Sequence, residues 1–156
     1  MAPRKTARIG EHFLHATDRC RVFSTLLDER NVYFYFEGQV DLAAFDATMA
    51  AANQALASGR AFLHGDGGTW KNYQAEYRQR WTDWFMANRS NVAHVNLLIR
   101  SPILKMGVQV VNMFTGNTIT TLEHETELYA ALHREVPGAG AIMSSWPDDI
   151  RARAAK

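Results

Sequence analysis

The sequence has little cysteine and little net charge. Cys20 is the only cysteine among 156 residues, so no disulfide can form within the chain, and such usage is typical of a reducing cytoplasm. The 17 lysines and arginines nearly balance the 16 aspartates and glutamates, which leaves a formal net charge of +1. Dedicated nucleic-acid-binding domains usually carry a clear basic excess. We therefore expect a cytoplasmic protein with no nucleic-acid partner.

Long apolar runs are also missing. The longest apolar region, residues 103–114, is interrupted by Lys105, Gln109 and Asn112, whereas a membrane-spanning helix needs about 20 predominantly apolar residues. The basic residues 1–8 are not followed by the apolar core of a signal peptide. The sequence therefore predicts neither a membrane span nor a secretory leader.

Known catalytic and metal-binding motifs are absent. The sequence contains no Gly-x-Ser-x-Gly, no Gly-Lys-Ser/Thr and no His-Glu-x-x-His. His12 and His15 lie three apart on an expected strand and so point to opposite faces, and Cys20 has no local partner. We expect no metal, no cofactor and no catalytic residue. Should the protein prove to be an enzyme, His64 and Asp66 are the first residues to test.

Strand signals dominate the first 40 residues. Strands are expected at 11–17, 20–27 and 32–40, and the polar turn Asp28-Glu29-Arg30-Asn31 predicts a hairpin between the last two. The run 32–36 is aromatic on both alternating faces. It is therefore expected to form a central strand covered on both sides to different extents.

From residue 41 the apolar period becomes helical. Asp41 suits an N-cap, and an apolar stripe follows it at Leu42, Phe45, Met49, Ala52 and Leu56. Short strands at 60–64, 92–99 and 118–122 then alternate with helices at 70–88, at 102–115 and at 123–133. The middle helix is preferred over a strand because its polar residues, Lys105, Gln109 and Asn112, recur on one face. This alternation predicts a largely parallel sheet in the later part of the chain.

This order resembles the STAS domain and its SpoIIAA-like relatives over residues 11–134. The similarity depends on residues 32–40 leading into the first helix, on the strands at 61–64 and 92–99, and on Ile119-Thr120-Thr121-Leu122 before the acidic and alanine-rich segment 125–132. It implies an α/β, STAS-like (SpoIIAA-like) fold, with a mixed β-sheet, an N-terminal hairpin and alternating βα units. We expect a flexible tail at 1–10, the domain at 11–135 and a C-terminal extension at 136–156.

Asp66-Gly67-Gly68-Thr69 is the most unusual segment. It is expected to form a loop between a strand and a helix, where open α/β sheets bind ligands and where backbone N–H groups can hold an anion. Anti-sigma factor antagonists carry an Asp-Ser-Ser-Gly-type segment with a phosphorylated serine there, so the resemblance implies Thr69 as a candidate phospho-acceptor. A tight glycine turn, with Thr69 capping the next helix, is the alternative.

Aromatic residues supply a candidate interface. Such residues usually fill a core, but they are also enriched at protein interfaces, and they can line a pocket for an apolar ligand. The candidates are Trp70, Tyr77, Trp81, Trp84 and Trp146.

Two non-enzymatic functions are therefore expected. The first is a regulatory or scaffolding module that acts through protein–protein interaction or self-association, presenting a helix face and the segment after residue 64. The second is a carrier or sensor of a small apolar ligand, which requires a cavity beneath the second and third helices, lined by residues such as Trp81, Met106 and Met113. The apolar residues of the C-terminal extension are expected to dock on the same chain.

Overall fold

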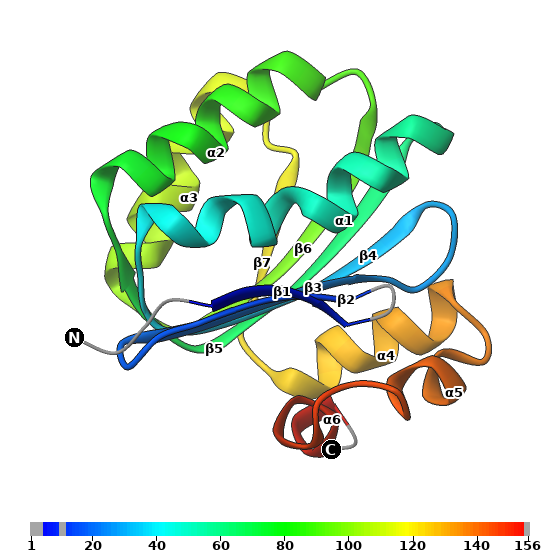
Figure 1. Ribbon diagram of the computed structural model, residues 1–156. Helices are drawn as coiled ribbons and strands as arrows, with labels where there is room; N and C mark the ends of the chain where they lie inside the picture. The colour runs from blue at the N-terminus through cyan, green and yellow to red at the C-terminus, as the bar shows by residue number, and fades with distance from the viewer. Residues whose placement is uncertain (1–4, 10–11, 155–156) are drawn as a thin grey trace.

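One seven-stranded sheet organises the computed structural model, which describes residues 5–9 and 12–154 (Figure 1). The strands lie side by side in chain order: β1 (Lys5–Ile9), β2 (His12–Ala16), β3 (Cys20–Leu26), β4 (Asn31–Val40), β5 (Ala61–Tyr73), β6 (Val92–Ile99) and β7 (Ile119–Leu122). Neighbours from β1 to β4 are antiparallel, and those from β4 to β7 are parallel. The predicted mixed sheet, with an antiparallel opening and later βα units, is confirmed.

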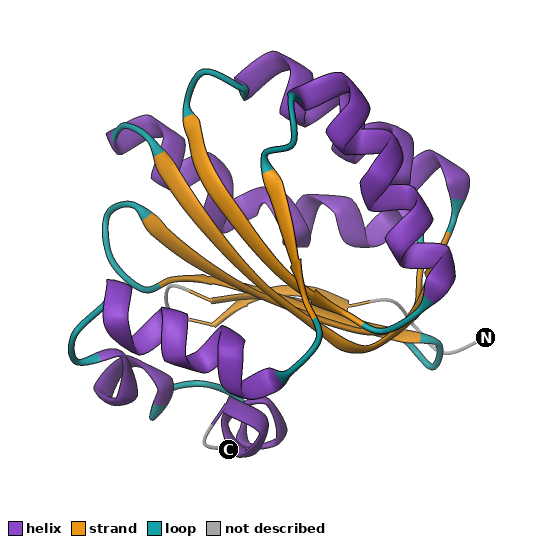
Figure 2. Cartoon of the chain, turned by 180° about the vertical axis from the view of Figure 1, so that it is seen from behind, coloured by secondary structure: helices purple, strands orange, loops and turns teal. Residues whose placement is uncertain are grey.

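The helices cover both faces of this sheet. The parallel strands follow one another in order, and right-handed crossovers that all step in one direction place their helices on the same face. These helices are α1 (Phe45–Ser58), which follows the 3-10 turn η1 (Leu42–Ala44), α2 (Ala75–Asn88) and α3 (Pro102–Thr115). The opposite face is covered by α4 (Glu125–Glu135), α5 (Ala139–Met143) and α6 (Asp148–Ala154) (Figures 1 and 2). In the part of the chain described, no helix is long and apolar enough to cross a membrane.

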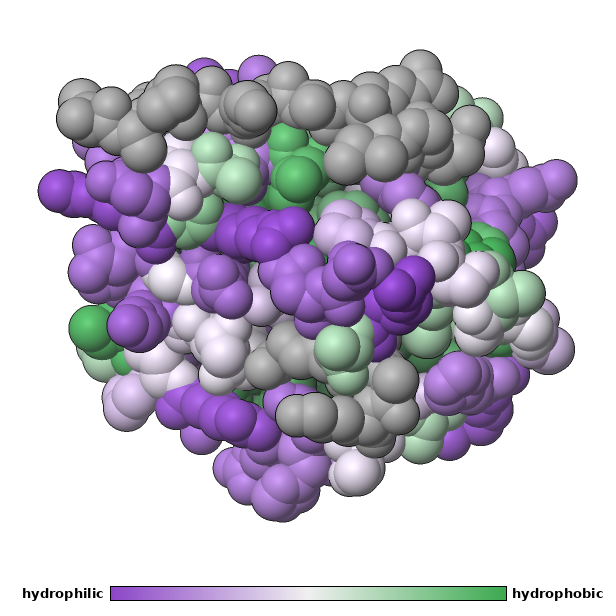
Figure 3. All heavy atoms as spheres, turned by 60° about the horizontal axis from the view of Figure 1, so that its bottom comes forward, coloured by the Kyte–Doolittle hydropathy of each residue, from purple (hydrophilic) through white to green (hydrophobic). Residues whose placement is uncertain are grey.

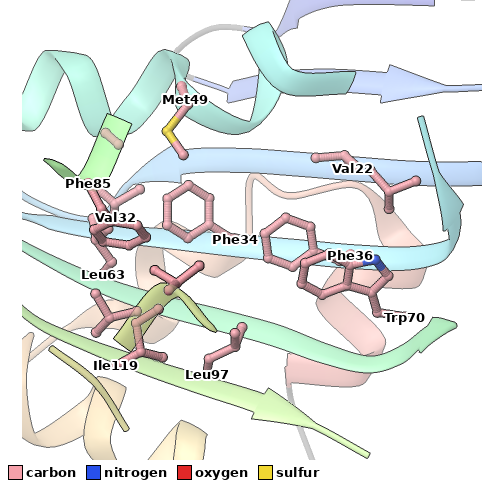
Figure 4. Close-up of a cluster of buried hydrophobic side chains, with 14 of the residues drawn as sticks. Val22, Val32, Phe34, Phe36, Met49, Leu63, Trp70, Phe85, Leu97 and Ile119 are labelled. Carbon is pink, nitrogen blue, oxygen red and sulfur yellow. The ribbon is translucent and has the colours of Figure 1, made fainter. Parts of the chain in front are cut away.

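Strand β4 contributes side chains to two hydrophobic cores, one on each face of the sheet, because successive side chains of a strand point to opposite faces. Phe34 and Phe36 pack on the α1–α3 side, with Met49 and Leu63 among their neighbours (Figure 4). The other face of β4 presents a second buried cluster with residues of α4 to α6, which includes Tyr33, Tyr35, Leu128, Leu132 and Trp146. The expected two-sided burial of this aromatic strand is observed.

The C-terminal extension docks on its own domain. The Trp146 ring stacks on Tyr33 with centroids 4.4 Å apart, and Ile150 is fully buried. The Ser145 hydroxyl also hydrogen-bonds Nε2 of His12 at 2.9 Å. Trp146 and Ile150 belong to the second core. Burial of each large apolar side chain contributes roughly 1.5–3 kcal/mol to the free energy of unfolding. Seen from this side, the described surface is largely hydrophilic (Figure 3).

Two predicted boundaries are wrong. Part of the expected tail forms β1, which pairs with β2 from Lys5 to Ile9; residues 1–4 and 10 lie outside the described residues. The expected loop 65–69 is the middle of β5, which continues to Tyr73, and α2 begins at Ala75 after Gln74. Pairing with β6 as far as Gly67, and with β4 on either side of a register shift between Asp66 and Thr69, keeps this glycine-rich segment extended. None of its glycines has a positive φ, so they do not serve a turn.

Candidate functional site

An apolar cavity of about 60 Å³ lies between the sheet and the helices α2 and α3. Its floor is formed by strands β4 to β7, its wall by the last residues of β5, and its cover by the two helices. Figure 4 shows several of the floor and wall residues around the centre of the first core. The lining residues are Phe34, Phe36, Gly65, Trp70, Tyr73, Tyr77, Arg78, Trp81, Phe85, Val95, Leu97, Leu104, Gly107, Val108, Val111 and Ile119.

Two glycines let neighbouring elements pack closely around this space. Gly65 lies on the floor, where an added Cβ would stand 2.6 Å from Leu97 Cδ1 and 3.5 Å from a ring carbon of Phe36. Gly107 lets α3 approach the hydroxyl of Tyr73. The backbone of α2 approaches that of α3 at more positions than that of any strand. Long aromatic side chains such as Trp81 bridge the distance from α2 to the sheet, where the Trp81 ring meets those of Phe34 and Phe36.

Few polar groups face this cavity. Tyr77 shares a hydrogen bond of 2.8 Å with Thr48, and burial raises the pKa of its hydroxyl far above the ordinary value, so it is neutral at physiological pH. Arg78 is the one charged residue among those that line the cavity; it is half-buried and forms no ion pair with a described residue. Almost all of the surface that lines the cavity is apolar, so Arg78 contributes mainly its hydrocarbon stem to the wall.

The predicted segment 66–69 lies elsewhere. Asp66 is fully buried on the opposite face of the sheet, where the Tyr129 hydroxyl donates to its Oδ2 at 2.6 Å and the Gly68 N–H donates to Oδ1 at 3.1 Å. Gly67 is buried as well, so the expected anion-binding loop does not form. Thr69 is exposed within the strand and does not cap α2; its role as a phospho-acceptor stays a prediction.

The predicted aromatic interface is largely internal. Trp70, Tyr77 and Trp146 are between 1% and 9% exposed, so these three cannot present a surface to a partner. Trp81 and Trp84 are half-buried and pack against the first core. Sequence reasoning expected Trp81 to line a cavity, and Trp81 does so together with Trp70 and Tyr77. It could not tell which tryptophans remain accessible, because that depends on tertiary packing.

The two methionines expected in the cavity point away from it. Met106 is 66% exposed and Met113 is 82% exposed. The helical phase of α3 turns Leu104, Val108 and Val111 inward instead. The outer face of α3 carries four exposed large apolar side chains, Ile103, Met106, Met113 and Phe114. The sequence-based assignment of a polar outer face missed these exposed apolar side chains.

His64 is one of the two residues that the sequence singled out for testing as catalytic. His64 is buried, and its Nε2 hydrogen-bonds Asn31 Oδ1 at 3.0 Å. Burial, helped by His94 and opposed by Asp28, lowers the pKa of His64 to about 4, so the ring is neutral at physiological pH. A buried neutral histidine with an amide partner fits a structural role.

Metal-ligand side chains do come together in the described residues, although their spacing in the sequence gives no motif. His15, Cys20 and Asp41 lie within reach of a common ion. The expectation that no metal site exists was based on linear spacing, which carries no information on contacts between neighbouring strands.

Comparison with known proteins supports the fold. No protein-family model and no curated protein matches the chain. Among solved structures, it is similar to the crystal structure of an uncharacterized DUF3478-family protein from Shewanella loihica PV-4, described as having a SpoIIAA-like fold. The TM-score is 0.53 at 12% sequence identity, over 83% of this chain and 92% of the other. At this identity the likeness concerns architecture alone, and it agrees with the predicted resemblance: the chain has a SpoIIAA-like fold.

Proposed function

We propose that this protein binds a small apolar molecule in the cavity beneath α2 and α3, as a carrier or sensor. The observation that carries the proposal is a cavity lined almost wholly by apolar atoms inside the first hydrophobic core. Apolar cavities stay dry and accept apolar guests, because a water molecule there would lose its hydrogen bonds. Protein–ligand pockets are usually lined predominantly by apolar side chains, and the lining of this cavity is almost wholly apolar.

Arg78 indicates which end group the ligand carries. A guanidinium whose hydrocarbon stem lines an apolar cavity, and which forms no ion pair with a described residue, is suited to hold a carboxylate. The aromatic rings of Trp70, Tyr77 and Trp81 offer flat surfaces to an aliphatic chain or a ring. The ligand class is therefore an apolar monocarboxylate, with its body under α2 and its charged end at Arg78.

Helix α2 is the element that would admit such a ligand. Only Tyr77 and Phe85 are buried on α2, whereas five residues are buried on α3 and six on α1. Segments with few buried apolar contacts open at the lowest free energy. Because usual ligand pockets measure about 300–1,000 Å³, a medium-length chain requires α2 to move outward from the position seen here.

The first test is native mass spectrometry of freshly purified protein, followed by calorimetric titration with decanoate and decanol. A mass excess that disappears on denaturation is expected, as is tighter binding of decanoate than of decanol. Arg78→Gln should remove this preference. Arg89→Gln, which removes an exposed charge just after α2, should retain it.

A cavity-filling pair separates internal binding from surface binding. Val108 faces the cavity from α3, and Gln109 beside it is exposed. Val108→Phe should abolish binding and Gln109→Phe should leave it intact, with thermal unfolding used to confirm that both variants fold. Equal decanoate affinity in the two folded variants would rule out the cavity as the site.

The outer face of α3 favours a second candidate function, the regulatory interaction module. Its four exposed apolar side chains fit a second copy of the chain, since a self-complementary apolar face is the simplest route to a dimer. Met106→Lys together with Met113→Lys should convert a dimer to a monomer in analytical ultracentrifugation. A wild-type monomer at high concentration would remove this candidate.

A further inference from the structure

Three side chains from three adjacent strands meet at one end of the sheet. His15 comes from β2, Cys20 is the first residue of β3, and Asp41 follows the end of β4. One ligand atom of each, an imidazole nitrogen, the thiol sulfur and a carboxylate oxygen, lies within 4.8 Å of the other two. His15 Nε2 and Asp41 Oδ1 are 3.4 Å apart. His15 and Cys20 are 1% and 3% exposed, and the side chain of Asp41 is 16% exposed.

Strand register brings these residues together. His15 is paired with Val22, and Cys20 stands two residues before Val22, so both side chains point to the same face of the sheet. Cys20 is itself paired with Gly38, near the end of β4 and shortly before Asp41. The spacing of 5 and 21 residues along the chain therefore hides a cluster that adjacent strands create.

Backbone hydrogen bonds hold the cluster in place. The Thr17 hydroxyl oxygen accepts from the N–H groups of Arg19 and Cys20, both at 3.1 Å, which fixes the turn that presents the thiol. The Asp41 carboxylate accepts from the Ala44 N–H at 3.2 Å as the cap of η1. Side chains whose orientation is set by a surrounding shell of hydrogen bonds are pre-organised as metal ligands.

The geometry is close to that of a tetrahedral zinc site. With Zn–N and Zn–O near 2.0–2.1 Å and Zn–S near 2.3 Å, a tetrahedron places nitrogen and oxygen about 3.3 Å apart and sulfur about 3.6 Å from either. The observed separation of 3.4 Å between His15 and Asp41 matches the first value. The 4.8 Å limit on the remaining pairs leaves an adjustment of about an ångström, within the range of side-chain rotation.

We propose that His15, Cys20 and Asp41 form a binding site for a divalent transition-metal ion, with Zn²⁺ as the best match. A set of imidazole, thiolate and carboxylate excludes Ca²⁺ and Mg²⁺, which take oxygen ligands. Thiolate and carboxylate together supply two negative charges to balance the ion. The partial exposure of Asp41 gives solvent access from which a water can complete the fourth position. Metal binding here requires no ligand in the apolar cavity.

Cobalt substitution tests this site directly. The full-length protein, stripped with a chelator and kept reduced, is titrated with Co²⁺ and followed by absorption. A thiolate-to-cobalt charge-transfer band in the near ultraviolet and intense visible bands from a tetrahedral ion are expected, and both should disappear when Zn²⁺ is added. Zn²⁺ should also raise the thermal unfolding temperature.

Matched variants identify the ligands. Cys20→Ser should abolish the charge-transfer band, and His15→Gln should weaken cobalt binding at least tenfold. Asp41→Asn retains an N-cap acceptor while removing the carboxylate charge, so it should weaken binding without loss of folding. His94→Gln, an exposed histidine on β6, should bind as the wild type does. The proposal is overturned if the wild-type protein gives no thiolate band, or if folded Cys20→Ser gives the same spectrum.

Discussion

Acidification should destabilise this fold through one buried residue, His64. The ring is 2% exposed, and its pKa is lowered from 6.5 to about 4, chiefly by burial. Between these two values the unfolded chain binds a proton at His64 and the folded chain does not. Stability is therefore fully present above pH 6.5 and falls as the pH drops toward 4, because protonation favours the unfolded state.

The size of the effect follows from the shift. One pKa unit corresponds to about 1.4 kcal/mol, and a group that titrates near 4 in the folded state and at 6.5 when unfolded contributes a loss of about 3 kcal/mol by pH 4. This is a large fraction of the 5–15 kcal/mol that stabilises a typical domain. Other groups also titrate in this range, so the contribution of His64 is isolated by difference.

Urea denaturation followed by tryptophan fluorescence at several pH values from 7 to 4 measures this difference. His64→Gln keeps a side-chain donor for Asn31 but cannot be protonated, so its unfolding free energy should fall less steeply with acidification than that of the wild type. His94→Gln should raise the pKa of His64 slightly, because His94 contributes to lowering it. Superimposable pH profiles for the wild type and His64→Gln would refute the reasoning.

Further predictions concern the second core and one backbone position. Tyr129→Phe should lower the free energy of unfolding by about 1.5–3 kcal/mol, because it removes a hydrogen-bond donor from the buried Asp66 carboxylate. Tyr33→Phe removes a hydroxyl–hydroxyl hydrogen bond of 3.1 Å and should lower it by about 1 kcal/mol. Urea denaturation compares the two variants, and an equal loss would contradict this ranking. Trp146→Ala should cost about 3–5 kcal/mol in the same assay, since its ring is 2% exposed, and a loss below 1 kcal/mol would show that the extension does not dock. Gly38→Ala should lower the free energy of unfolding by about 1–3 kcal/mol, because φ is +78° at Gly38 and an added Cβ would clash with the backbone of the β2–β3 turn. An unchanged midpoint of urea denaturation would contradict this prediction.

Much of the architecture could be predicted from local pattern. The hairpin at Asp28 and the helix after Pro102 were identified because turn chemistry, capping and periodicity agree at those places. The resemblance to SpoIIAA-like proteins was carried by element order, which depends on these same local signals. The similarity to the DUF3478 structure is of the same kind, since it lies in the architecture.

The site was less predictable because it depends on contacts between segments. The run from Gly65 to Gly68 has the composition of a turn, but pairing of Gly65 and Asp66 with both β4 and β6, and of Gly67 with β6, makes it part of a strand. The amphipathic pattern of α3 shows that one face is buried, but it did not show that Met106 and Met113 lie on the outer one. A cavity arises where side chains from different segments fail to fill a space, so no local residue pattern predicts it.

The strict chain order of the strands has a consequence for synthesis on the ribosome. Each βα unit adds to an edge formed just before it, so the sheet and its first core can assemble as the chain emerges, through contacts between near neighbours in sequence. The face that carries Tyr33 and Tyr35 receives its cover only from α4 to α6. Nascent chains that end before Trp146 therefore display an aromatic surface, and they are the species for which a chaperone would compete with aggregation.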